Sequence, residues 1–489
     1  MKKTLVFVLA ILMLLALAAC GAKEIPNAET MADYASVGES YREAVKYVVA
    51  EGVMKADENN NFLPQENLTV AEAENIVSIL MGQKPASKAI GETVSSNDFG
   101  LMVMRATNCM DDALAGELIG YNASFTTDPV TKEHAAQILS NYLTFKGAKE
   151  TNMQKTELSF AHGNGVRLLG RAEATENGVM TNFPCDGVEF TLECAGPMDV
   201  AFVVEGTGQY RAEVDGILVD FKEDAADLVR LAHMIPAGKH TIRILQENDI
   251  PTPGTCNTIR GISMLCKPET LVPTEEKPLY IEFLGGSSAA GMGAIGDNTT
   301  KWNRQAHSGT HSYSYMTAKK LGADLSVVAK GGIGILGTTH VSQGTYVASE
   351  LYAAQNVYRD ENRPATHGKA DVVIVGVGGN DKEEKPDTRF ENTFRELMKQ
   401  VRQANPDAEI VIIFNWMNSR HGFFYRSLPE ELGGREAGYH VIMMERLTNG
   451  VRSGSATNTP HPSAEDNERH SDKIVEYLKT IPSVQAKLK

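Results

Sequence analysis

The chain has 489 residues, enough for about three or four domains of ordinary size. Its 47 basic and 62 acidic side chains give a formal net charge of −15, which argues against nucleic acid as a partner and is typical of a soluble, exported surface protein. After the first 20 residues no stretch is long and apolar enough to span a bilayer.

Residues 1–20 have the pattern of a lipoprotein signal peptide. A basic head is followed by an apolar core from Leu5 to Leu17, which is too short for a good membrane span, and two alanines then precede Cys20. This ending resembles the lipobox of bacterial lipoproteins, which implies that Cys20 is acylated and anchors the mature protein to the outer face of the cell membrane. The alternative is an ordinary cleaved signal with a chance cysteine.

Five more cysteines follow, and because five is odd, at least one stays unpaired within the monomer. None belongs to a C-x-x-C pair, so a zinc ribbon is not expected. Four of them fall in one β-rich region, where disulfides and buried free thiols both remain open. The five are Cys109, Cys185, Cys194, Cys256 and Cys266.

Residues 21–150 are predicted to be helical. Tyr41 to Val53 has helical spacing, and Thr69 with Glu72 forms a capping-box pattern that opens a second helix. A fainter copy of this pattern follows about sixty residues later, with Thr131 in the place of Thr69.

These residues resemble S-layer homology repeats, with Phe62-x-Pro64 and Thr69-x-Ala71-Glu72 as the match. The arginine usual after the threonine is Val70 here and Lys132 in the second copy, and only two copies are visible where the family commonly has three. The resemblance implies attachment to cell-wall polymer through residues 31–145. The alternative is a helical spacer.

Residues 155–268 show short alternating runs between turns, which predicts an all-β sandwich. Val214-Asp215-Gly216 is a hairpin signature, because Asp-Gly suits a two-residue turn with positive φ. The region resembles the N-terminal jelly-roll of family 2 carbohydrate esterases, through Gly170-Arg171, this hairpin and the segment Gly238 to Ile242. The module either supports the next domain by packing or binds sugar.

In residues 278–489 strands alternate with helices after a Pro-rich linker. Near-continuous apolar strands predict a parallel sheet covered on both faces, which is a three-layer α/β domain. Strands are expected at 280–284, 325–329, 371–377 and 409–414, and helices at 311–321, 389–404 and 469–480.

Polar or glycine-rich motifs follow the first three strands. Ser287 follows the first, Gly331-Gly332 the second and Asn380 the third, and His461-Pro462 comes near the chain end. Open α/β sheets collect their sites at the carboxyl ends of strands, so these loops are expected to converge. Acyl transfer needs such a set: a nucleophile, a base and fixed donors for an oxyanion.

These residues resemble the SGNH hydrolase superfamily, and within it carbohydrate esterase family 2, over residues 155–489. The resemblance implies Ser287 as nucleophile and His461 as base. It also implies an oxyanion hole made by Ser287, Gly332 and Asn380, with no metal or other cofactor.

Two positions depart from the family pattern. Gly286 stands where the first block usually has Asp, and Asn458 stands where an acid usually precedes the histidine by three residues. An Asn carbonyl can accept the imidazole N–H and orient the ring, but it cannot stabilise an imidazolium by charge. A Ser–His dyad enzyme, a weakened enzyme and a pseudoenzyme therefore remain open.

Two stretches fit Gly-x-Gly-x-x-Gly, at 291–296 and 332–337. A dinucleotide site needs a helix opening at those glycines, and the residues after both stretches do not favour helix. Trp302 and Trp416 are candidates for a sugar-stacking face, although either is more often a core residue.

Together these features predict a lipid-anchored surface esterase that removes O-acetyl groups from polysaccharide through an acyl-enzyme. The alternatives are a non-catalytic glycan-binding pseudoenzyme of the same fold and a sugar O-acetyltransferase.

Overall fold

The structure is a computed structural model, and the chain divides into two compact units, Met1–Thr151 and Asn152–Lys489. None of the helices it describes combines the length and apolar character needed to cross a membrane. The described residues are 26–84, 91–107, 126–150, 155–194, 198–206, 208–218, 228–235, 238–249, 257–265, 271–297, 299, 306–337, 347–355, 365, 369–381, 388–414, 421–452 and 461–488.

The first unit is helical, as predicted. The capping box at the start of α3 is present, since Thr69 accepts from the Glu72 N–H while the Glu72 carboxylate accepts from the Thr69 N–H. Its helices are α2 (Arg42–Ala50), α3 (Val70–Leu80), α4 (Ser96–Ala106) and α6 (Lys132–Glu150), with 3₁₀ turns η1 (Ala28–Thr30), η2 (Tyr34–Ser36) and η3 (Glu39–Tyr41).

The structure shows three equivalent helix starts in this unit, where the sequence suggested two copies. The segments before α3, α4 and α6 meet in a closed ring of backbone hydrogen bonds: Leu68 N–H to Val130 O at 2.8 Å, Val130 N–H to Val94 O at 2.9 Å, and Val94 N–H to Leu68 O at 3.0 Å. Each of the three side chains is buried. The additional helix start is at Ser95, the N-cap residue of α4. Asp98 occupies the position where a capping box usually has Glu.

The β-rich middle of the second unit is two six-stranded antiparallel sheets around one apolar core. The orders are β3-β4-β11-β6-β9, with β1 beside β11, and β12-β5-β10-β7-β8, with β2 beside β5. The predicted hairpin joins β7 to β8, with φ of 51° at Asp215 and 84° at Gly216. The strands are β1 (Lys155–Ser159), β2 (Arg167–Leu169), β3 (Glu173–Thr175), β4 (Gly178–Thr181), β5 (Gly187–Cys194), β6 (Met198–Glu205), β7 (Tyr210–Val214), β8 (Ile217–Leu218), β9 (Leu228–Ile235), β10 (Gly238–Gln246), β11 (Asn257–Leu265) and β12 (Val272–Pro273).

Residues from 280 onward form the predicted parallel sheet, in the order β14-β13-β15-β16-β17. The last strand, β17, and the helices α8, α10 and α12 were not predicted, and α11 begins five residues earlier than expected. The elements are β13 (Tyr280–Gly285), η6 (Gly309–His311), α7 (Tyr313–Leu321), β14 (Asp324–Ala329), α8 (Ala348–Ala353), β15 (Val372–Gly376), α9 (Thr388–Ala404), β16 (Glu409–Phe414), α10 (Gly422–Glu431), η9 (Gly434–Ala437), β17 (Tyr439–Met443), α11 (Ala464–Leu478) and α12 (Pro482–Lys487).

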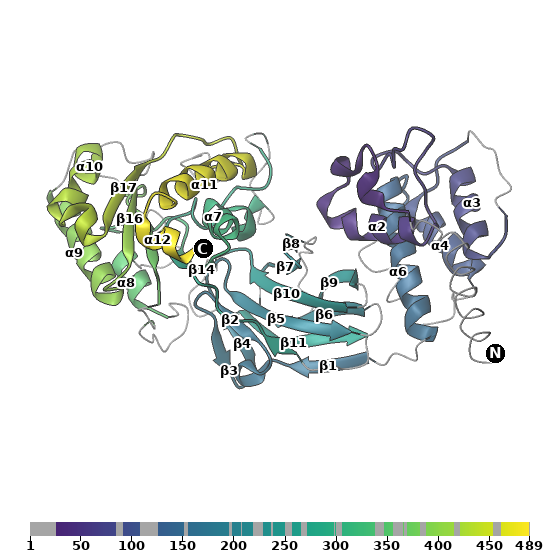
Figure 1. The fold of residues 1–489 in the computed structure, drawn as a ribbon, viewed down its shortest axis with the longest axis horizontal. Helices are drawn as coiled ribbons and strands as arrows, with labels where there is room; N and C mark the ends of the chain where they lie inside the picture. The colour runs from purple at the N-terminus through teal and green to yellow at the C-terminus, as the bar shows by residue number, and fades with distance from the viewer. Residues whose placement is uncertain are drawn as a thin grey trace, which may run out of the picture. The chain divides into compact units, whose positions relative to one another are not determined.

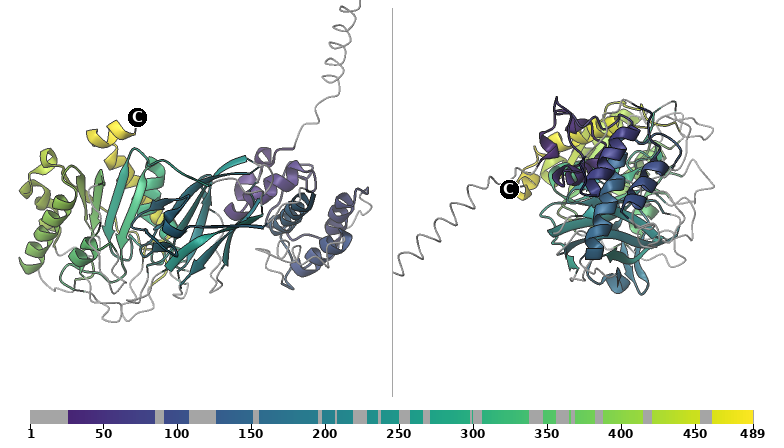
Figure 2. Two further views of the ribbon diagram at one scale, coloured as in Figure 1. Left: turned by 90° about the horizontal axis from the view of Figure 1, so that it is seen from below. Right: turned by 90° about the vertical axis from the view of Figure 1, so that its right-hand side faces the viewer.

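Helices cover both faces of this sheet, so the domain has three layers (Figures 1 and 2). Alternate residues of each strand enter different cores, as the period of two requires. Phe283 and the strand residues on the same face of the sheet pack against α7, α11 and α12. Leu284 and the strand residues on the opposite face pack against α8, α9 and α10.

The sandwich packs onto the α/β domain through buried arginines. Arg171 donates to the carbonyls of Tyr352 at 2.9 Å and Ala354 at 2.6 Å, and it pairs with Glu282 of β13 at 3.2 Å. Arg167 pairs with Asp324 of β14 at 2.7 Å. A buried ion pair that loses one partner leaves an uncompensated charge, so these contacts hold the two parts of the unit in a defined arrangement.

Candidate active site

Ser287 stands on a tight turn that directly follows β13. The turn is closed by hydrogen bonds from the Ala290 N–H to Gly286 O at 3.1 Å and from the Met292 N–H to Ser287 O at 2.9 Å. Gly285 is required at the strand end, because a Cβ there would lie 2.3 Å from the Ala289 Cβ. The serine is only 5% exposed, so its hydroxyl faces a protein environment.

The structure brings His461 against this serine, with the His461 Nε2 2.9 Å from the Ser287 Oγ. The histidine lies just before α11, 174 residues along the chain from the serine. Its segment is held to the serine turn by the Gly450 N–H, which donates to His461 O at 2.8 Å, and by the Val451 N–H, which donates to Gly293 O at 3.0 Å. This pair has the geometry that a nucleophile and its general base need.

Asp466 stabilises the start of α11 beside the histidine. Its carboxylate accepts from the Asn449 N–H at 2.6 Å and from the Ser463 N–H at 3.0 Å. Partial burial by itself would raise the pKa of Asp466, but these hydrogen bonds outweigh it and lower the pKa. The carboxylate therefore stays charged at neutral pH and holds the loop that carries His461.

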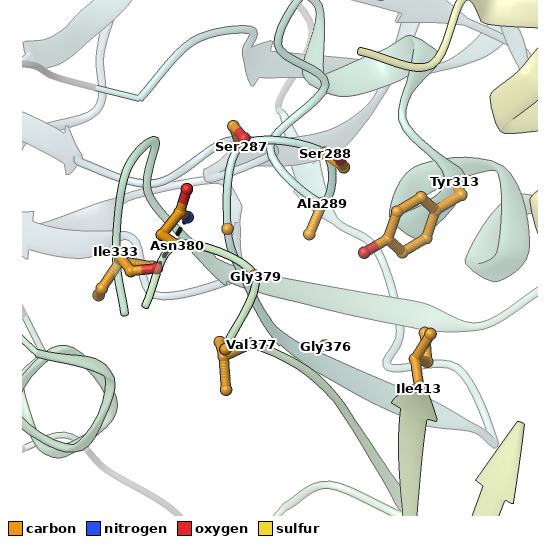
Figure 3. A pocket seen from close by; sticks show the side chains of 12 residues that line it. Ser287, Ser288, Ala289, Tyr313, Ile333, Gly376, Val377, Gly379, Asn380 and Ile413 are labelled. Atoms are coloured by element: carbon orange, nitrogen blue, oxygen red, sulfur yellow. Dashed lines mark hydrogen bonds between the residues drawn. The ribbon is translucent and has the colours of Figure 1, made fainter. Parts of the chain in front are cut away.

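Asn380 follows β15 and lies beside the serine turn, lining the same cavity (Figure 3). One of its amide N–H groups donates to Ile333 O at 2.9 Å, which fixes the side chain and leaves the second N–H available. The neighbouring Asp381 accepts from the Ile335 and Leu336 N–H groups, so the loops after β14 and β15 are tied together.

Gly332 stands in the turn after β14 with φ of +79°, a conformation that favours glycine. Among the described residues, neither the Gly332 N–H nor the Ser287 N–H has a hydrogen-bond acceptor. Two backbone donors and one amide donor thus remain on elements that meet at the serine. Donors of this kind bind the oxyanion of an acyl-transfer intermediate.

The cavity beside Ser287 has mainly apolar walls. Ala289, Val377 and Ile413 line it, and Tyr313 from α7 directs its hydroxyl into it (Figure 3). Burial raises the pKa of Tyr313, so the phenol is neutral at physiological pH. At Gly286 an added Cβ would meet only the Asn380 Nδ2, at 3.4 Å, so packing alone does not explain the missing aspartate.

Several predicted site residues lie outside the described residues. These are the histidine-orienting candidate Asn458, the lipidation candidate Cys20 and the stacking candidates Trp302 and Trp416. Within the described ranges, Cys185 is a buried free thiol, and no three His, Cys, Asp or Glu side chains are close enough to hold a metal ion. Cys109, Cys256 and Cys266 lie outside those ranges, and the side chain of Cys194 is not among those described.

Two residues near the site were missed by the sequence analysis. Asp249, from the end of β10, accepts from the Gly331 N–H at 2.8 Å, and His307 contacts Ala290 O at 2.8 Å through its Nε2. Asp249 belongs to the sandwich, and no local motif marks either residue. Only the packing of the two parts brings them to the site.

Comparison with known proteins shows two matching families. Residues 283–479 match the GDSL-like lipase/acylhydrolase family, and residues 30–74 match the S-layer homology domain. No curated protein sequence matches this chain significantly.

Solved structures of carbohydrate esterases are similar to this chain over about two thirds of its length. One is a family two carbohydrate esterase from Cellvibrio japonicus, with a TM-score of 0.57 and 15% identity over 69% of this chain and 100% of that one. Another is a family two carbohydrate esterase from Clostridium thermocellum in complex with cellohexaose. Its TM-score is 0.53, with 18% identity over 64% of this chain and 98% of that one. An acetyl xylan esterase from the rumen bacterium Butyrivibrio proteoclasticus has a TM-score of 0.54, with 17% identity over 67% of this chain and 98% of that one.

At these identities the likeness shows a shared fold, in which a β-rich module precedes a parallel-sheet α/β domain. Residues 283–479 are thus a domain of the GDSL-like lipase/acylhydrolase family, joined in one chain to an S-layer homology domain at residues 30–74.

Proposed function

We propose that this protein is a cell-surface serine esterase that removes O-acetyl groups from polysaccharide. The observation that carries the proposal is the 2.9 Å contact between the Ser287 Oγ and the His461 Nε2, beside backbone donors that have no other acceptor among the described residues. A nucleophile beside its base, with donors left for an oxyanion, is the set that acyl transfer requires.

In the proposed reaction the Ser287 Oγ attacks the acyl carbon while the His461 Nε2 takes the hydroxyl proton. The Ser287 and Gly332 N–H groups and the Asn380 amide bind the oxyanion. The C–O bond to the sugar then breaks, and the histidine returns the proton to the departing sugar oxygen. Water repeats the sequence on the acyl-enzyme, releasing acetate and restoring the serine.

We infer a Ser–His dyad in which a neutral acceptor, with Asn458 as the candidate, holds the ring instead of a carboxylate. Such an acceptor fixes the tautomer but adds no charge stabilisation to the imidazolium. A lower turnover than that of a full triad is therefore expected.

The choice of substrate rests on fold-level analogy. Structures with this fold include an acetyl xylan esterase and an esterase in complex with cellohexaose. We infer an acetylated polysaccharide as the substrate of this chain, and we infer that its sandwich has the jelly-roll topology of those enzymes.

The test is acetate release by the protein from residue 22 onward, on acetylated xylan and on an activated acetyl ester. The proposal expects release from both substrates, and covalent labelling of Ser287 by a fluorophosphonate. No release from either, together with an unlabelled Ser287, would favour the glycan-binding pseudoenzyme. Acetyl transfer to added sugar that outpaces acetate release would favour the acyltransferase.

Gly293→Ala is expected to impair this reaction by displacing the base. A Cβ at this position, where φ is +73°, would lie 2.7 Å from Val451 O and 3.0 Å from the His461 Cβ. A misplacement of about 1 Å costs about 10²-fold in rate, so kcat should fall by about 10- to 100-fold.

The matched control is Gly322→Ala, because Gly322 has φ of +60° and an added Cβ there would meet nothing within 4 Å. Gly322→Ala also places a Cβ at positive φ, which costs about 1 kcal/mol of folding stability, but this Cβ does not contact the histidine. Equal kcat values for the two variants would contradict the role of Gly293.

For the location, we propose a cell-envelope protein held by lipid on Cys20 and by the S-layer homology region. The support is the signal-peptide pattern and the match at residues 30–74. Membrane fractionation of cells that produce Cys20→Ser should show release from the membrane. Retention of the variant in detergent-extractable membranes would contradict the lipid anchor.

A further inference from the structure

The segment that ends β10 of the sandwich is fixed firmly in place. The Glu247 N–H donates to Gln209 O and the Gly309 N–H donates to Glu247 O, both at 2.7 Å. The Asn248 side chain accepts from the Gln209 N–H at 2.8 Å. The Gln246 amide donates to Asn248 O at 2.6 Å. Asp249 therefore directly follows a buried segment that hydrogen bonds hold in place, and Asp249 itself is only 7% exposed.

The Asp249 carboxylate reaches two loops of the candidate active site. Its Oδ2 accepts from the Gly331 N–H at 2.8 Å, and its Oδ1 lies 3.5 Å from the His307 Nδ1. The His307 Nε2 in turn lies 2.8 Å from Ala290 O, in the turn that carries Ser287. The Nε2 must carry the proton there, because a carbonyl oxygen only accepts. One sandwich carboxylate therefore binds the oxyanion turn directly and lies beside the histidine that contacts the nucleophile turn.

The hydrogen bond to Asp249 fixes the peptide that carries the Gly331 N–H, at the start of the two-glycine turn. Gly331 and Gly332 lack side chains, so hydrogen bonds hold this turn: the Gly331 N–H donates to Asp249, and the Ile333 N–H donates to Lys330 O at 3.4 Å. An added Cβ at Gly331 would lie 2.7 Å from the Met292 Cε, so the turn packs closely on the serine turn. With the Gly331 N–H bound to Asp249, the Gly332 N–H is the donor left for an oxyanion.

We propose that Asp249 is a positioning residue for the oxyanion hole, so that the β-sandwich contributes directly to the reaction as well as to packing. This inference rests on the proposed esterase function. The side chain touches no reacting atom. It acts by holding the Gly331–Gly332 turn in the orientation that transition-state binding requires, and a donor aimed correctly in advance costs no reorganisation during the reaction.

The test compares Asp249→Ala with Asp249→Asn in the full mature chain. The Ala variant removes the acceptor and should lower kcat by about 10- to 100-fold while KM changes by less than about threefold. The Asn variant keeps an oxygen that accepts from the Gly331 N–H and should recover most of the activity.

Glu213→Ala is the matched control, because Glu213 is another buried sandwich carboxylate that contacts the α/β domain, through Tyr315 of α7. It should lower the melting temperature without a selective loss of kcat. Equal kcat values for Asp249→Ala and the wild type, or equal losses in Asp249→Ala and Glu213→Ala, would overturn the proposal.

A second readout separates this inference from the esterase proposal. Amide hydrogen exchange at Gly331, followed by NMR, reports the hydrogen bond without any turnover. Protection at Gly331 should be lost in Asp249→Ala and retained in Asp249→Asn. Inactive wild-type protein with this pattern would refute the esterase but leave Asp249 as the residue that orders the turn. Unchanged protection in Asp249→Ala would refute the positioning role even if the protein is an active esterase.

Discussion

Ser287→Ala is expected to lower kcat/KM for an activated acetyl ester by about 10⁴-fold, which corresponds to about 5.5 kcal/mol of lost transition-state stabilisation. The reason is that the Ser287 Oγ is the attacking oxygen, held 2.9 Å from the His461 Nε2 that takes its proton. The oxyanion donors remain in the variant, so a rate above the buffer background should persist. Initial rates at substrate concentrations below KM measure the effect.

Ser288→Ala is the matched control for this experiment. Ser288 is the neighbouring residue of the same turn and is similarly buried, but among the described residues its hydroxyl has no hydrogen-bond partner. Its removal should change kcat/KM by less than about threefold, because the variant loses no hydrogen bond of this hydroxyl to the described residues. If Ser288→Ala is inactive while Ser287→Ala is active, the assignment of the nucleophile is wrong.

His461→Ala should also lower kcat/KM by about 10³- to 10⁴-fold, because the serine then has no group to take its proton. KM should change little, since the imidazole acts on the serine proton rather than on the bound sugar. The measurement is a full kinetic curve for each variant, with folding checked by thermal denaturation.

The double variant Ser287→Ala/His461→Ala provides a sharper test of the pair. Residues that act as one unit are strongly non-additive, so the double variant should be about as active as either single variant. Losses that multiply would show that the two residues act independently. The 2.9 Å contact would then be structural only.

Much of the architecture follows from the sequence because it depends on local pattern. The apolar runs at Ile281, Val372 and Ile410 and the amphipathic segment at 389–404 predicted the alternation of strands and helices that the structure shows. The Asp215-Gly216 turn and the Thr69 cap were likewise found, since each depends on a few consecutive residues. The third helix start, at Ser95, was missed because its capping partner is Asp98 and its neighbouring sequence diverges.

The order of amino acids was enough to name the reactive groups, which are Ser287, His461 and Asn380, with glycines beside them. How these groups meet depends on the folded chain, because 174 residues separate His461 from Ser287 and the parallel strand order brings their loops to one edge. The folded chain alone showed Asp249, which comes from the sandwich and reaches the oxyanion turn across the junction with the α/β domain. Local patterns encode elements, whereas contacts between residues far apart in the chain arise from packing, which no short stretch of sequence specifies.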